Sequence, residues 1–117
     1  MTRPDRQEDI AVAVFAALTE PTRRAILTEL ATRGPATATD LAERLPISRQ
    51  AITKHLGLLS DSALVTSQLG ERRRVRYLVN TEPITIAQSF LAALAHDWDT
   101  RLGALQDYLQ PTQGDDT

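Results

Sequence analysis

The side chains with the clearest chemical capacity lie between residues 44 and 76, and they are cations and amides rather than nucleophiles. This stretch holds seven basic residues against two acidic ones, a local charge of +5, whereas the remainder of the chain carries −7. A basic patch on an acidic body is typical of a surface that binds phosphate groups. Arg49 and Gln50 can also form paired hydrogen bonds to base edges, arginine with guanine and glutamine with adenine.

The residues for other chemistries are missing or isolated. The chain has no cysteine, which excludes disulfides, thiolate metal sites and cysteine redox switching. Ser60, Asp61 and His55 are close in sequence, but no motif supplies an oxyanion hole, and there is no glycine-rich phosphate loop. His96 is the one imidazole in the C-terminal part, where scattered carboxylates make a weak metal site. We therefore expect no catalysis, no cofactor and no bound metal.

Two short helices are predicted to position the base-reading donors. Thr37-x-x-Asp40 has the form of a capping box and opens a helix that ends near Leu45, and Ser48 is a good N-cap for a second helix over residues 48–60. The second helix has an apolar face of Ala51, Ile52, Leu56 and Leu59, and an outward face of Arg49, Gln50, Thr53, Lys54 and Gly57. This pattern predicts a helix-turn-helix, whose second helix enters the major groove of duplex DNA.

A hairpin is predicted to follow directly. Residues 64–69 and 73–78 have strand character and are joined at Gly70 and Glu71, with Val75, Tyr77 and Val79 expected to alternate with outward residues. Four arginines lie at or near its tip, where they can reach flanking backbone or the minor groove: Arg72, Arg73, Arg74 and Arg76. A hairpin in this position is the wing of a winged helix-turn-helix.

The remaining segments predict packing between subunits. Helices are expected over residues 7–18, from Pro21 to before Gly34, and over residues 83–109. The last helix would span nearly 40 Å, longer than a domain this small can cover, although a core helix within one chain is the alternative. We predict a dimer through the first and last helices, with this interface: Val14, Phe15, Leu91, Leu94, Trp98, Leu102 and Leu105.

The sequence resembles the ArsR/SmtB family of winged-helix repressors over about residues 10–109. The resemblance lies in the run from Ile47 to Leu56 (Ile-Ser-Arg-Gln-Ala-Ile-Thr-Lys-His-Leu), in residues 18–27, in the arginine wing and in the His96–Trp98 segment. It implies a dimer built on the first and last helices and an operator of partial twofold symmetry. Where thiolate sensors of the family carry Cys-x-Cys-Asp-Leu, this chain has Thr37-Ala-Thr-Asp-Leu, so it resembles a branch that does not sense metals.

These observations together predict a mainly α fold, a winged helix-turn-helix of five helices and a two-stranded wing. A flexible arm is expected at residues 1–6, one DNA-binding and dimerisation domain at 7–109, and a disordered tail at 110–117. We expect a cytoplasmic transcriptional regulator that does not enter a membrane, with no assignable effector. The alternative is a winged-helix module that binds an acidic protein. The expected DNA-binding residues are Thr37, Thr39, Ser48, Arg49, Gln50, Thr53, Lys54, His55, Arg72, Arg73, Arg74 and Arg76.

Overall fold

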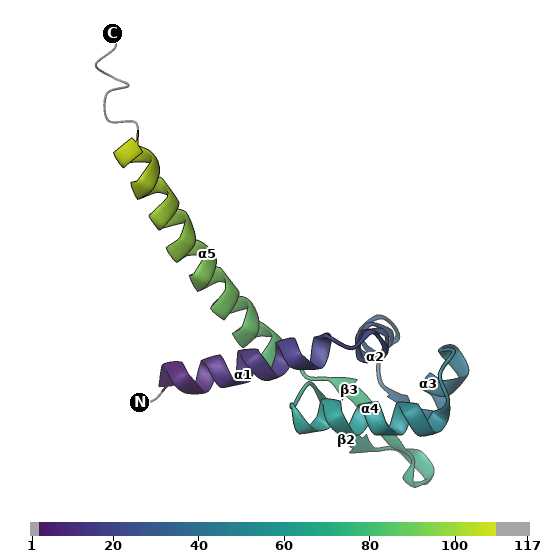
Figure 1. Ribbon diagram of the computed structural model, residues 1–117. Helices are drawn as coiled ribbons and strands as arrows, with labels where there is room; N and C mark the ends of the chain where they lie inside the picture. Colours follow the sequence, from purple (N-terminus) through teal and green to yellow (C-terminus); the bar gives the residue numbers. More distant parts are fainter. Residues whose placement is uncertain (1–2, 110–117) are drawn as a thin grey trace.

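The computed structural model describes residues 3–109, which form five α-helices and a three-stranded antiparallel sheet (Figure 1). In chain order the elements are α1 (Arg3–Leu18), α2 (Pro21–Arg33), β1 (Ala36–Thr37), α3 (Ala38–Arg44), α4 (Arg49–Asp61), β2 (Val65–Leu69), the 3₁₀ helix η1 (Glu71–Arg73), β3 (Val75–Val79) and α5 (Glu82–Leu109). The winged helix-turn-helix fold is confirmed. Helix α1 begins ahead of its expected start at residue 7, and the expected tail at 110–117 lies outside the described residues.

Local hydrogen bonds explain where the helices of the helix-turn-helix begin. Thr37 and Asp40 form the predicted capping box: the Asp40 N–H donates to Thr37 Oγ1 at 3.0 Å, and the Thr37 N–H donates to Asp40 Oδ2 at 3.1 Å. Ser48 Oγ accepts from the Ala51 N–H at 3.1 Å and caps α4. Each cap satisfies backbone donors that the first helical turn leaves unpaired. The predicted starts of both helices are therefore confirmed.

The sheet has one strand more than the sequence predicted. The order is β1-β3-β2, because the two-residue strand β1 pairs with β3, Ala36 opposite Tyr77 and Thr37 opposite Arg76. A strand of two residues is too short to show an alternating pattern, so sequence periodicity could not reveal it. The expected alternation in the wing is also only partly present, since Tyr77, Leu78 and Val79 are half-buried in succession and Val75 is exposed. The consequence of β1 is that the base of the wing is tied to the start of α3.

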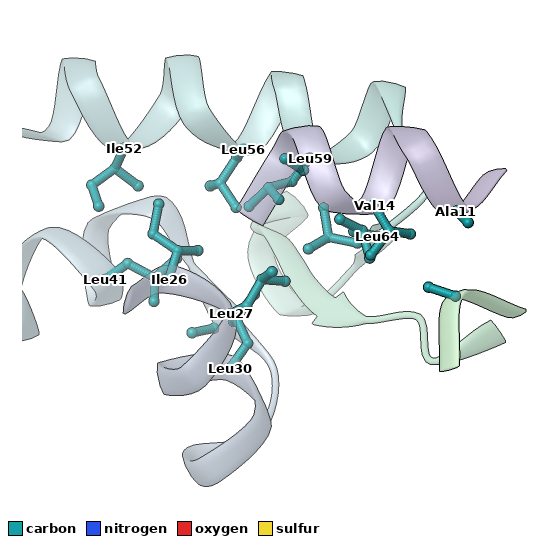
Figure 2. Packing of buried hydrophobic residues seen from close by; sticks show 14 residues of the cluster. Ala11, Val14, Ile26, Leu27, Leu30, Leu41, Ile52, Leu56, Leu59 and Leu64 are labelled. Atoms are coloured by element: carbon teal, nitrogen blue, oxygen red, sulfur yellow. The ribbon is translucent and has the colours of Figure 1, made fainter. Parts of the chain in front are cut away.

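The core joins α4 to the three helices before it and to the sheet. Figure 2 shows Ile52, Leu56 and Leu59 pointing from α4 toward side chains of the other elements. The largest fully buried side chains are Ile26, Leu41, Ile52, Leu56, Leu59, Leu64 and Val14. The predicted apolar face of α4 is therefore part of the core, and burial of this face orients the opposite face toward solvent.

Helix α5 extends well beyond this core (Figure 1). The radius of gyration is 20.9 Å, against about 13 Å for a compact domain of this length. The first turns of α5 pack on α1, with Ala87 buried and the rings of Phe15 and Phe90 6.4 Å apart between centroids. From residue 91 to 109 every residue except the half-buried Gly103 is exposed. Within residues 3–109, no helix combines the length and apolar character needed to cross a membrane.

Candidate nucleic-acid interface

The outward face of α4 presents donors at the N-terminal end of the helix. Arg49, Gln50, Thr53 and Lys54 are all exposed, whereas Ile52 behind them is fully buried. Helix geometry places residues three and four apart on one face, so Arg49, Gln50 and Thr53 lie next to one another. These three side chains also line a shallow depression of about 320 Å³. The start of α4 therefore forms a surface of hydrogen-bond donors that projects away from the core.

A larger hollow joins this surface to the wing and to the start of α3. Its volume is about 520 Å³. Six of the predicted DNA-binding residues line it, from three parts of the chain: Thr37, Thr39, Arg49, Thr53, Arg73 and Arg74. Three guanidinium groups around one hollow create a positive potential, and threonine hydroxyls add neutral donors, a combination that suits phosphate oxygens. Tyr77 and Val75 line the same hollow and were not predicted to be near it.

The wing tip has an unusual backbone for an arginine run. Arg72 has φ +58° and Arg73 has φ +61°, both in the left-handed region. The Arg74 N–H donates to the Glu71 carbonyl at 3.1 Å, and the Gly70 N–H donates to the Arg74 carbonyl at 2.7 Å. Two consecutive left-handed residues are typical of the tight hairpin turn that normally carries Asn-Gly. Arginines in this conformation cost stability, and such costs are concentrated at functional sites.

The glycine before the tip leaves space for the close approach of the Arg76 side chain. A Cβ atom at Gly70 would lie 3.0 Å from Arg76 Cδ and 3.4 Å from the Arg74 carbonyl oxygen. Because Gly70 has no side chain, the Arg76 side chain crosses directly over its backbone. This arrangement keeps Arg76 exposed on the wing together with Arg72.

Ser48, like Thr37, is the N-cap of a helix, and His55 is half-buried. The Ser48 hydroxyl oxygen already accepts from the Ala51 N–H as the cap of α4, so its first role is structural. His55 is half-buried, and its Nδ1 is inaccessible and has no hydrogen-bond partner among the described residues. The half-buried imidazole is consistent with packing within the helix-turn-helix, and its contact with DNA stays a prediction.

Two carboxylates at helix starts are stabilised in their charged form. The Thr37 backbone N–H holds the pKa of Asp40 below its ordinary value, and Arg44 and Arg74 add smaller favourable contributions. The Thr22 backbone N–H likewise lowers the pKa of Glu20, which caps α2. The pairing of Thr37 with Arg76 places the wing close to the start of α3. Negative charge at this position also favours the helix, because the N-terminus carries a partial positive charge.

The predicted dimer residues fall into two groups. Leu91, Leu94, Trp98, Leu102 and Leu105 are all exposed on α5, between 40% and 60%. Val14, in contrast, is 2% exposed and belongs to the core of the single chain. Its assignment to an interface between subunits is therefore corrected, because α1 turns this side chain toward α4 and the sheet. Phe15 is half-buried against Phe90, and the sequence reasoning missed Val12, which is exposed on α1.

Comparison with known proteins supplies an independent result. A family model described as a helix-turn-helix domain matches residues 18–68, which run from the end of α1 to β2. The chain is 42% identical over 106 residues to the HTH-type transcriptional regulator Rv2034 of Mycobacterium tuberculosis, covering 86% of this chain and 89% of that protein. It is 37% identical over 68 residues to the transcriptional repressor SdpR of Bacillus subtilis, covering 58% of this chain and 73% of that protein.

A solved structure agrees over most of the chain. The ArsR-like transcriptional regulator from Rhodococcus sp. RHA1 is 40% identical and superposes with a TM-score of 0.80. The match covers 86% of this chain and 93% of that one. The likeness therefore extends well beyond residues 18–68, which the helix-turn-helix family model matches.

Proposed function

Because this chain belongs to the ArsR family of helix-turn-helix transcriptional regulators, we propose that it is a homodimeric repressor that binds an inverted-repeat operator in duplex DNA. The observation that carries the proposal is the 520 Å³ hollow, around which α3, α4 and the wing bring together Arg49, Arg73 and Arg74. Three guanidinium groups around one hollow suit the phosphates of a duplex backbone. We place its action in the cytoplasm, with residues 7–109 as one DNA-binding and dimerisation domain.

In the proposed complex, α4 is the recognition helix. Arg49 and Gln50 are at its first turn and exposed, the position from which helix-turn-helix proteins read base edges in the major groove. Thr53 and Lys54 lie one turn later and suit phosphate oxygens. Thr37 and Thr39, at the start of α3, line the same hollow and add hydroxyl donors; Thr37 Oγ1 accepts from the Asp40 N–H, and its hydroxyl can still donate. The contacts of Arg49 and Gln50 with base edges give sequence preference. The contacts of the threonines and Lys54 with the DNA backbone set orientation and affinity.

The wing supplies contacts to DNA beside the recognition helix. Arg72 and Arg73 occupy the tip, and Arg74 and Arg76 follow on the way into β3. Arginine side chains can enter a narrow minor groove or pair with backbone phosphates. These contacts depend on charge rather than on base identity, so they raise affinity for all duplexes and make it depend on salt.

The proposed dimer is supported by the apolar face of α5. Ala87, Leu91, Leu94 and Trp98 recur at spacings of four, three and four residues, so they lie on one face of the helix. That face is buried on α1 at Ala87 and exposed from Leu91 onward. A second copy would extend the same packing along α5. Two recognition helices related by a twofold axis then require inverted half-sites, about 34 Å apart along the duplex.

The test is selection of bound duplexes from a random-sequence DNA pool at about 150 mM salt. We expect an inverted repeat for the unaltered protein, and loss of preference at one base pair for Arg49→Ala or Gln50→Ala, at a cost of about 1–3 kcal/mol. Arg33→Ala is the matched control, because Arg33 pairs with Glu29 at 3.1 Å, away from the hollow. An unchanged motif in both α4 variants would refute this placement of the recognition helix. Weak binding without any preferred duplex would favour the acidic-protein alternative.

A further inference from the structure

A second cavity lies at the other end of α4, away from the proposed DNA surface. It has a volume of about 420 Å³ and opens to solvent between α1, the turn that follows α4, and the first turns of α5. Its apolar lining comes from Ile10 and Ala13 of α1 and from Pro83 and Ile86 of α5. Cavities of this size and character are typical of sites for small organic molecules. It would hold a molecule with an aromatic ring or a branched alkyl group.

The charges around this cavity are mostly negative. Asp9 of α1, Asp61 of α4 and Glu82 of α5 contribute carboxylates from three different elements, and Arg6 is the one basic residue in the lining. Among the residues that the structure describes, none of these carboxylates has a basic group within ion-pair distance. An apolar site with an excess of carboxylates is complementary to an organic cation, whose charged end pairs at the rim while its body packs on the apolar lining.

The cavity wall adjoins the proposed dimer face of α5. Since each residue of an α-helix turns by about 100°, Ile86 is about 140° around the α5 axis from Leu91, whereas Pro83 is about 20° from Leu94. The wall therefore extends from the edge of the exposed stripe to the neighbouring side of the helix. A partner subunit packed along the stripe would lie next to the cavity.

The cavity wall also connects the recognition helix to the dimerisation helix. Asn80 is part of the wall, and its Nδ2 donates to the Ala63 carbonyl, in the turn after α4, at 2.9 Å. Its Oδ1 accepts from the Glu82 N–H, at the start of α5, at 3.3 Å. Ala63 itself has φ +62°, a left-handed conformation that a residue with a side chain rarely adopts. A ligand held here touches both ends of the Asn80 bridge.

We propose that this cavity binds a small organic cation, a primary amine on an apolar body, and that its occupancy changes the affinity of the protein for its operator. The regulatory part rests on the proposed function, whereas amine binding does not. By linkage, an amine that changes operator affinity by a given factor has its own affinity changed by operator DNA by the same factor.

Binding is tested on the full chain without DNA, by calorimetry and by NMR. The probe is 2-phenylethylamine, compared with neutral 2-phenylethanol and anionic phenylacetate. We expect saturable binding of the amine, shifts in the amide resonances of Ala13, Ala63 and Ile86, and at least about fivefold weaker binding of the other two. Equal binding of the alcohol, or no amine binding up to about 10 mM, overturns the proposal.

Two variants locate the site and one controls for charge. Asp61→Asn combined with Glu82→Gln should weaken the amine at least about fivefold, as expected when two rim carboxylates are neutralised. Ile86→Trp should abolish binding by filling the cavity, with an unchanged circular dichroism spectrum and melting temperature showing that the protein is folded. Asp97→Asn removes a carboxylate farther along α5 and should leave amine binding unchanged. If Asp97→Asn weakened amine binding equally, the amine would be held by the general negative charge of the protein, and the proposed site would be wrong.

Regulation is tested by measuring the affinity for the selected operator with and without saturating 2-phenylethylamine. We expect a change of at least about threefold, and we expect Asn80→Ala to bind the amine while losing that change. An unchanged operator affinity overturns the regulatory part. If the protein selects no duplex but still binds the amine, the proposed DNA-binding function is wrong while the amine site stands. Failure of the proposed function and failure of the amine site are therefore distinguishable.

Discussion

The helix-turn-helix body and the distal half of α5 carry similar side chains in opposite environments. Ile52 of α4 is 0% exposed, whereas Trp98 of α5 is 60% exposed, although both lie on the apolar face of a two-faced helix. In the body, the apolar face of α4 is buried in a core with side chains such as Val14, Ile26 and Leu41 of the preceding helices (Figure 2). Beyond Phe90, nothing within residues 3–109 covers α5, where every residue except the half-buried Gly103 is exposed. The difference teaches that an amphipathic pattern predicts a buried face, but not whether the same chain buries it.

The largest expected effect comes from opening the core of the body. Ile52→Ala removes a fully buried side chain, so we expect a loss of about 3–4 kcal/mol in the free energy of unfolding. Denaturant unfolding should show the same loss at low and high protein concentration, because this core belongs to one chain. A loss that disappeared at high concentration would assign Ile52 to an interface instead.

A charge on the exposed face of α5 should weaken the dimer, whereas the fold of the single chain should be unaffected. For Trp98→Asp we expect at least about a 100-fold weaker dimer, about 3 kcal/mol, because a carboxylate would be buried between the two subunits. Sedimentation at several concentrations measures this, and circular dichroism should show that the body remains folded. Asp97→Asn is a control on the same helix. A Trp98→Asp protein that remained a dimer would show that the stripe is covered by another element.

The wing tip offers a trade between stability and binding. Replacing Arg72 by Asn and Arg73 by Gly should raise the free energy of unfolding by about 1–2 kcal/mol, because Asn-Gly suits two left-handed positions. The same change should weaken binding to all duplexes and lower the slope of affinity against salt concentration by about two. Arg72→Lys with Arg73→Lys keeps both charges and is the control for the salt slope. Unchanged DNA affinity in the Asn-Gly protein would remove the wing from the interface.

The smallest effect concerns the cap of α3. The pKa of Asp40 is lower in the folded protein than its ordinary value of 3.8. The ionised Asp40 carboxylate therefore contributes its full stabilisation above pH 3.8, and this contribution is lost as the pH falls through the lower pKa of the folded protein. We expect Asp40→Ala to cost about 0.5–1 kcal/mol at pH 7. The two proteins should converge in stability only as the pH falls below the folded pKa of Asp40, which itself lies below 3.8. A difference that persisted there would mean that Asp40 acts through packing rather than through its charge.

Local sequence was sufficient wherever the determining interactions are local. The capping box of Thr37 and Asp40 and the Ser48 cap involve residues three apart, and both were predicted correctly. The same holds for the two faces of α4, since Ile52 and Leu56 are buried and Thr53 and Lys54 are exposed as their spacing predicts. Helix periodicity and capping depend on neighbours along the chain, which a sequence displays directly.

The sequence pattern could not predict interactions between segments that are distant along the chain. The pairing of Thr37 with Arg76 created β1, a strand too short to have a period of its own. Val14 has the same residue type and spacing as an interface residue, yet it is buried within the chain. His55 likewise follows Lys54 directly, but only the packing of α2 beside α4 decides that its imidazole is half-buried.

The sequence by itself thus determined the helices, their caps, the basic stretch and the family. Only the tertiary structure decided that Thr37, Arg49 and Arg73 surround one hollow, and that a second cavity with carboxylates lies at the other end of α4. The physical reason is that periodicity and capping are short-range, whereas a shared surface requires chain segments tens of residues apart to meet through burial of the core.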